Sequence, residues 1–110
     1  MQSVSSNAVA GLFNSSIDNT KFAFSSTANT EVTAQHTGIC YITFDQRNTG
    51  GTTIIENGKS LISDDNYMSM SGYLSSYRYF TILIRKGRRY SWIGTDGVIY
   101  RQQFIPFNIS

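Results

Sequence analysis

The stretch that decides the fold is Tyr77-Arg-Tyr-Phe-Thr-Ile-Leu-Ile-Arg-Lys-Gly-Arg-Arg-Tyr-Ser-Trp-Ile93. Apolar and polar residues alternate in its first half, so that Phe80, Ile82 and Ile84 share one side of an extended chain. The glycine of Lys86-Gly87 can adopt the positive φ that a tight connection between strands often needs. The stretch therefore predicts two β-strands joined as a hairpin, and it contains no recognisable catalytic motif.

Further strand patterns lie on both sides of this stretch. Residues 39–44 are mostly β-branched and aromatic, and residues 52–56 and 59–62 flank Asn57-Gly58, the strongest short hairpin signal. The other segments with strand character are 21–25, 30–34, 68–74 and 98–105. Strands at roughly 8–12-residue spacing with turn signals between them are typical of a β-sandwich or barrel.

Residues 1–20 follow a different pattern and predict a short helix with a linker. Ala8 and Leu12, like Val9 and Phe13, recur at helical spacing and give one apolar stripe. A helix of about 10 residues is too short to stand alone in water, so it packs either on its own domain or on copies of itself. We favour the second. The predicted oligomerisation residues are Val4, Ala8, Val9, Leu12 and Phe13.

Length and composition predict one small domain with few charges. The chain has 110 residues, of which 15% are charged and 40% are hydrophobic, whereas a typical soluble domain carries about 25% charged residues. A net charge of +2 does not by itself indicate a nucleic-acid partner. No apolar run is long enough to span a membrane, and no export signal is visible.

The sequence offers few residues for chemistry. Cys40 has no second cysteine to pair with, and Cys40 and His36 are too few for a zinc site. His36 lacks a recognisable nucleophile partner, although copies of it could meet on an oligomer axis. Asp64-Asp65 with Asp45 could bind Ca²⁺ but lacks the alternating ligands of a calcium loop, so a solvated turn is favoured. We expect no cofactor, no metal and no enzymatic activity.

Two pieces of the chain resemble a known group of proteins. Ser3-Val-Ser-Ser-Asn-Ala-Val-Ala10 resembles a short helical segment that recurs in tail-fibre and other tail proteins of bacteriophages and prophages. Segments 37–44, 53–60 and 81–87 resemble the strand pattern of the small jelly-roll module at the C-terminal ends of such proteins. The resemblance implies an all-β, jelly-roll-like antiparallel β-sandwich over residues 21–110, a helix and linker over 1–20, and a homotrimer at a fibre end.

Basic residues and tyrosines suggest a binding surface. The sharpest cluster is Arg85-Lys-Gly-Arg-Arg89, with Arg78 and Arg101 elsewhere in the same third of the chain. It predicts either an anionic partner or a solvated hairpin tip whose charges deter strand pairing, and the interleaved tyrosines either stack on sugars or pack in a core or interface. The candidate ligand-binding residues are Arg85, Arg88, Arg89, Tyr77, Tyr79 and Tyr90.

Together these observations predict a tail-fibre-type structural or receptor-binding domain that attaches to a host surface as a homotrimer. Such a protein is made in a bacterial cytoplasm and ends up in the virion. The alternatives are a monomeric carbohydrate-binding module of a bacterial surface protein, an adaptor that binds another tail protein, and a polysaccharide depolymerase.

Overall fold

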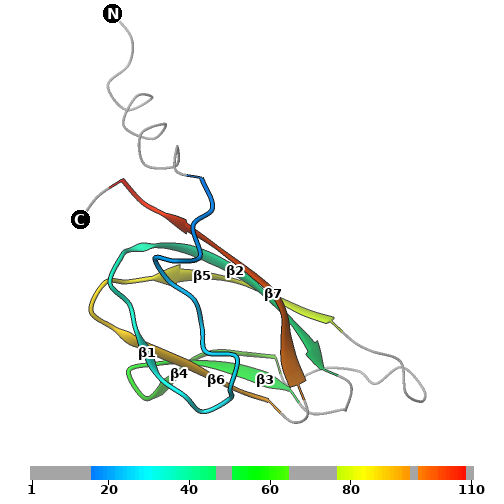
Figure 1. Ribbon diagram of the computed structural model, residues 1–110. Coiled ribbons are helices and arrows are strands. Elements are labelled where there is room, and N and C mark those ends of the chain that lie inside the picture. The colour runs from blue at the N-terminus through cyan, green and yellow to red at the C-terminus, as the bar shows by residue number, and fades with distance from the viewer. Residues whose placement is uncertain (1–15, 47–50, 65–76, 95–96, 109–110) are drawn as a thin grey trace, which may run out of the picture.

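The computed structural model describes residues 16–46, 51–64, 77–94 and 97–108 (Figure 1). The strands in this part are β1 (Val32–Thr33), β2 (Gly38–Gln46), β3 (Thr52–Glu56), β4 (Lys59–Asp64), β5 (Tyr77–Ile84), β6 (Arg89–Gly94) and β7 (Gly97–Pro106). All pairings are antiparallel, and the described residues contain no helix, so the prediction of an all-β protein is confirmed. The predicted N-terminal helix and the possible strand at 68–74 lie outside the described residues.

The strands form two sheets that are stacked face to face, with orders β1-β6-β3-β4 and β5-β2-β7 (Figure 1). They pair from the outside of the sequence inward: β1 with β6, β2 with β5 and β3 with β4. The chain thus resembles one long antiparallel ribbon folded at Asn57-Gly58. Further pairing of β2 with β7 and of β3 with β6 winds this ribbon into the two sheets.

The turn at the middle of the ribbon is the predicted hairpin. Asn57 and Gly58 have φ values of 52° and 80°, as a two-residue type I′ connection requires. Glu56 and Lys59 pair on either side of them. The hairpin predicted from the Asn-Gly pattern is therefore confirmed.

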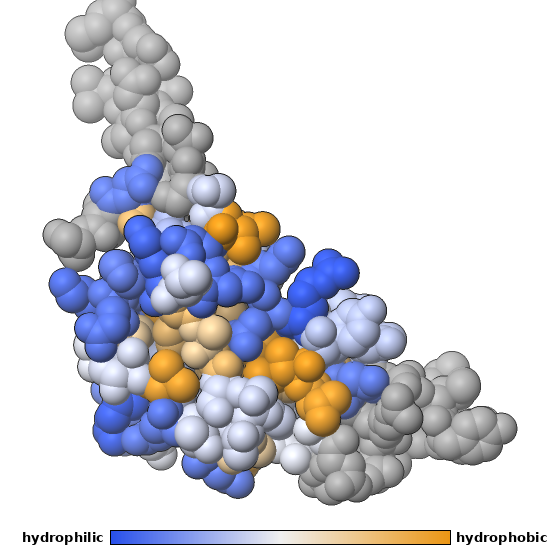
Figure 2. Space-filling model, viewed as in Figure 1, coloured by the Kyte–Doolittle hydropathy of each residue, from blue (hydrophilic) through white to orange (hydrophobic). Residues whose placement is uncertain are grey.

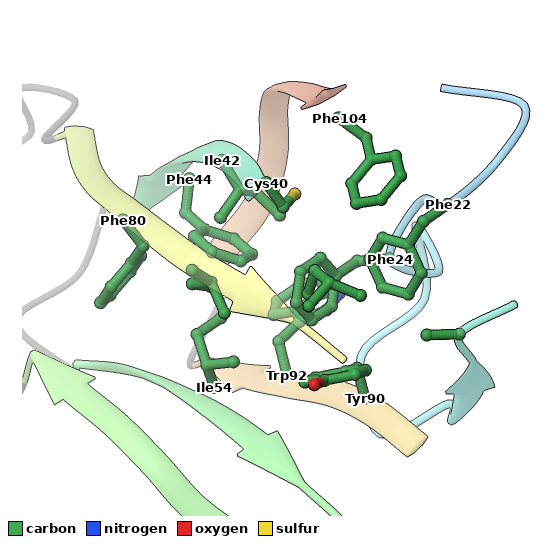
Figure 3. Close-up of a cluster of buried hydrophobic side chains, with 13 residues drawn as sticks. Phe22, Phe24, Cys40, Ile42, Phe44, Ile54, Phe80, Tyr90, Trp92 and Phe104 are labelled. Carbon is green, nitrogen blue, oxygen red and sulfur yellow. The ribbon is translucent and has the colours of Figure 1, made fainter. Parts of the chain in front are cut away.

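One cluster of buried side chains fills the space between the sheets (Figure 3). Residues of β5 alternate between exposed and buried as predicted, and the inward residues Phe80, Ile82 and Ile84 belong to this cluster together with Tyr90 and Trp92 of the opposite sheet. The ring centroids of Phe44 and Trp92 lie 4.9 Å apart, and those of Phe44 and Phe80 lie 5.8 Å apart. Burying each such side chain contributes about 1.5–3 kcal/mol, so this cluster supplies the main driving force for stacking the sheets.

The prediction that β5 and β6 form a hairpin is wrong. Among the described strands β5 pairs with β2 alone, whereas β6 pairs with β1 and β3 in the other sheet, so the turn at Lys86-Gly87 links the two sheets. Both strands carry a buried face, and these faces contact each other across the core instead of lying side by side. The link is held by hydrogen bonds from Lys86 N to Thr37 Oγ1 (3.0 Å) and from Gly87 N to the Ala34 carbonyl (2.8 Å).

Residues 18–29, here called the strap, run beside β7 and cover one edge of the sheet pair. Residues 21–25 are not a strand, contrary to the weak alternation in their sequence. The Gln102 side-chain amide takes the place of a second strand: it donates to the Phe24 carbonyl (3.0 Å) and accepts from Phe24 N (2.8 Å). Trp92 Nε1 donates to the Ser25 carbonyl (2.7 Å). These bonds hold Phe22 and Phe24 in the core, where both are less than 5% exposed.

Candidate functional site

The predicted ligand-binding residues fall into two separate regions. Tyr77 begins β5, and Arg85 follows its last residue, eight positions along the chain. A strand rises about 3.3 Å per residue, which puts these two residues roughly 26 Å apart. The tyrosines at one end of the sheet and the arginines at the other therefore cannot contact one small ligand together.

The arginine region is residues 85–89, here called the basic tip. Arg88 lies 3.3 Å from Glu56, and Arg89 lies 3.3 Å from Glu31, so two of its cations have carboxylate partners. The Arg89 pair is exposed, and such pairs contribute at most about 1 kcal/mol. Arg78 is only 2% exposed and is not part of this surface. The geometry of the basic tip is that of a paired, solvated turn.

Tyr90 belongs to the core and not to a binding surface, since its relative exposure is 0%. Its hydroxyl donates to Glu56 Oε2 (2.5 Å) and accepts from Arg85 N (2.8 Å). Burial, followed by the hydrogen bond to Glu56, raises the pKa of Tyr90 to about 12. The expectation that its ring could stack on a ligand is therefore corrected.

Tyr77 and Tyr79 take part in a hollow on the outer face of the β5-β2-β7 sheet. The hollow, here called the tyrosine hollow, has a volume of about 310 Å³. It is lined by Thr43, Tyr77, Tyr79, Tyr100 and Arg101. Thr43 of β2 is paired with Tyr79 on one side and with Arg101 on the other, which places the three in one row across the sheet. The rings of Tyr77 and Tyr100 lie beside this row with centroids 5.0 Å apart.

A β-bulge brings Tyr100 and Arg101 into the hollow together. Thr43 pairs with Arg101 but the next residue, Phe44, pairs with Ile99, so Tyr100 has no partner in β2. An extra residue of this kind redirects side chains, and both Tyr100 and Arg101 are exposed although they are consecutive. The sequence contains no turn or glycine signal that announces this bulge, and Tyr100 was for that reason absent from the predicted site.

The hollow is part of a wider face with exposed apolar side chains. Tyr41 and Leu83 are 47% and 41% exposed, and Val98 is 57% exposed. Figure 2 shows hydrophobic residues gathered near the start of β7. This face of the sheet therefore offers both a hollow and an apolar surround.

The electrostatics of the hollow depend on Arg101. Its guanidinium is exposed, and no carboxylate of the described residues lies within ion-pair distance of it, in contrast to Arg88 and Arg89. The register places the acidic residue Asp45 one position beyond Phe44, paired with Tyr77 and Val98, but Asp45 is only 8% exposed and does not line the hollow. The hollow thus presents one positive charge among hydroxyl groups and rings.

The described residues contain no group of three or more histidines, cysteines, aspartates or glutamates that could hold a metal ion. Cys40 is buried and free, and burial raises the pKa of its thiol to about 12. His36 is exposed. Two predictions fall on residues that the structure does not describe. They concern Asp65, which the possible calcium site would include, and the oligomerisation residues between Val4 and Phe13.

In the part of the chain that the structure describes, no helix is long and apolar enough to cross a membrane. Comparison with known proteins does not assign the chain to a family: no family model matches it, and no match is found among curated proteins or among solved structures.

Proposed function

We propose that this domain is a glycan-binding attachment module and that the tyrosine hollow is its binding site. The observation that carries the proposal is the grouping of three tyrosines, a threonine and an arginine around one hollow on a sheet face. Aromatic rings stack on the apolar faces of sugars, while hydroxyl and guanidinium groups form hydrogen bonds with sugar hydroxyls. A volume near 310 Å³ is at the lower end of the range for small-molecule sites and suits one or two sugar rings.

The way the site is built supports binding without reorganisation. The described lining residues lie on β2, β5 and β7, whose backbones are held by strand pairing on both sides of the bulge at Tyr100. Tyrosine has only two side-chain torsions, so holding it in place on a ligand costs little entropy. Each site can therefore bind weakly but specifically, and several copies on one particle would add avidity.

The strand pairing supports a jelly-roll topology for the domain. A jelly roll is a long antiparallel ribbon wound into two sheets. The nested pairs β1 with β6, β2 with β5 and β3 with β4 follow that scheme. The strap fits the place of an additional outer strand, because Asp18 N donates to the Phe104 carbonyl of β7 (2.8 Å). Together with the Ser3–Ala10 motif, this topology favours a tail-fibre setting: a homotrimeric virion protein that attaches to a host surface.

Binding assays with hollow variants test the proposal. The full chain is screened against an array of bacterial surface polysaccharides, and hits are compared with Tyr79→Ala and Tyr100→Ala. Loss of a stacking ring is expected to weaken binding by about 10-fold or more. Tyr41→Ala is the matched control, because Tyr41 is exposed on the same sheet but does not line the hollow. Failure to bind any glycan, or equal loss in the control, would overturn the proposal.

A second candidate is an adaptor that binds another tail protein, and the exposed Tyr41, Leu83 and Val98 around the hollow favour it. A protein partner would cover this whole apolar face, so Tyr41→Ala would weaken its binding as much as Tyr79→Ala. Binding of the chain to host cells and to purified tail proteins, measured with both variants, separates the two candidates. We propose no catalytic activity, and a cleaved product in the glycan screen would contradict this.

A further inference from the structure

We infer that the tyrosine hollow selects sugars that carry a negative charge and that Arg101 is the group that recognises the anion. This inference rests on the proposed function and adds the chemical class of the ligand. The charge can come from a carboxylate, as in a uronic acid, or from a phosphate, as in a polysaccharide whose sugars carry phosphate groups as substituents. Both present oxygens that a guanidinium binds through paired hydrogen bonds.

The charge balance of the hollow is the first support. Among the residues that the structure describes, its lining holds one cation and no acid: Thr43 and three tyrosines accompany Arg101. A neutral sugar would leave that cation without a counter-charge, whereas an acidic sugar would neutralise it.

The availability of Arg101 is the second support. Two of the three arginines of the basic tip, Arg88 and Arg89, already lie 3.3 Å from Glu56 and Glu31, so an incoming anion must displace a carboxylate to reach either of them. Among the described residues Arg101 has no such partner to displace. Charge-assisted hydrogen bonds to such a guanidinium are about twice as strong as neutral ones. The hollow also joins this cation to exposed tyrosine rings, whereas Tyr90 beside the basic tip is buried.

The spacing of the row across the sheet is the third support. Thr43 separates Tyr79 from Arg101, which puts their backbones two strand spacings, or roughly 10 Å, apart. A sugar ring that stacks on Tyr79 can therefore lie over Thr43 and direct an exocyclic carboxylate or phosphate at Arg101. The nearest acid by register, Asp45, lies in another row of the sheet, between Tyr77 and Val98, and is not among the lining residues of the hollow.

Paired glycans test the inference. Acidic bacterial polysaccharides are arrayed beside their own carboxyl-reduced or dephosphorylated forms, and binding of the full chain is measured by calorimetry for each pair. Hydrogen bonds to charged groups are worth about 1.5–3 kcal/mol, so we expect the acidic form to bind about 10- to 100-fold more tightly. Carboxylate and phosphate members of the array tell which source of charge is preferred.

Matched variants assign the effect to Arg101. Arg101→Gln should abolish the preference for the acidic form, because it weakens binding of that form far more than binding of the neutral form, and Arg101→Lys should keep part of the preference. Arg85→Gln removes the same charge at the basic tip and should leave the preference intact. Circular dichroism checks that each variant is folded.

The outcomes separate this inference from the proposed function. If acidic and neutral forms bind equally, or if Arg85→Gln reduces the preference as much as Arg101→Gln, the inference is overturned while the glycan site remains. If binding is confined to neutral glycans, the inference is likewise overturned. If no glycan binds, the proposed function and the inference fail together.

Discussion

Gly38 is the residue at which close packing is most demanding. It begins β2, and a Cβ atom there would overlap the Ile105 carbonyl oxygen and lie 2.6 Å from Phe104 Cζ. Gly38→Ala must therefore move β7 or the Phe104 ring, and we expect it to lower the free energy of unfolding by about 1–3 kcal/mol. Urea denaturation measures this. Thr81→Ala is the control: Thr81 is on the exposed face of β5, so its replacement should change the free energy of unfolding little. An unchanged urea midpoint for Gly38→Ala would contradict the close approach of β7 to Gly38.

Tyr90 gives the fold a specific pH dependence. The folded protein keeps this phenol protonated up to about pH 12, whereas the unfolded chain ionises it near the usual value of 10.0. Its contribution to stability is therefore fully present below pH 10 and is lost between pH 10 and 12, at up to roughly 1.4 kcal/mol per pH unit. Urea midpoints measured from pH 9 to 12 should fall more steeply for the wild type than for Tyr90→Phe. If the urea midpoints of the wild type and of Tyr90→Phe fall equally with pH, the phenol of Tyr90 is not held protonated by burial.

At the scale of elements, the strap depends on one side chain of β7. Gln102→Ala removes both hydrogen bonds to Phe24, and leaving these backbone groups unsatisfied should cost about 1–3 kcal/mol. Because Trp92 Nε1 donates to Ser25 of the same strap, fluorescence of this single tryptophan should also shift to the red. Gln103→Ala, the neighbouring residue, is the control for both readings. A variant with wild-type stability and spectrum would mean that the strap is held by its phenylalanines alone.

The sequence predicted most elements but not how they are distributed between the sheets. β2 to β7 coincide with predicted strands, because alternation and the Asn57-Gly58 turn are local signals. Whether the turn at Lys86-Gly87 joins neighbours in one sheet or crosses between two depends on which distant strands pair with β5 and β6, and local alternation is the same in both cases. The strap was interpreted as a weak strand because burial of Phe22 and Phe24 produces the same period of two.

The candidate site was predicted in part for the same reason. Tyr77 and Tyr79 were identified from their alternation, and their exposure follows directly from it. Tyr90 has an equally tyrosine-rich setting but is buried, which depends on the opposite sheet. Tyr100 and Arg101 reach the hollow through the bulge opposite Thr43, a feature of strand pairing that the sequence of β7 does not encode locally.

For the whole molecule, the proposal predicts an assembly of three chains. Light scattering should give about three times the 12.3 kDa mass of one chain, because we predict that the short apolar stripe of the N-terminal segment is buried against copies of itself and not against its own domain. Leu12→Asp places a charge in that stripe and should reduce the mass to that of one chain, while Thr81→Asp on the sheet face should not. A single-chain mass for the wild type at all concentrations would favour the monomeric carbohydrate-binding module instead.

The contact between the strap and β7 has a consequence for how the domain can be connected to other chains. Since Asp18 and Phe104 are hydrogen-bonded neighbours, the polypeptide enters and leaves the sheet pair at one place (Figure 1). A domain whose chain enters and leaves at one place can be inserted into a loop of another protein. It can also be circularly permuted, with new termini at Asn57-Gly58, without breaking any strand pairing. We therefore expect the order of the strands along the chain to be changeable while the two-sheet architecture is kept.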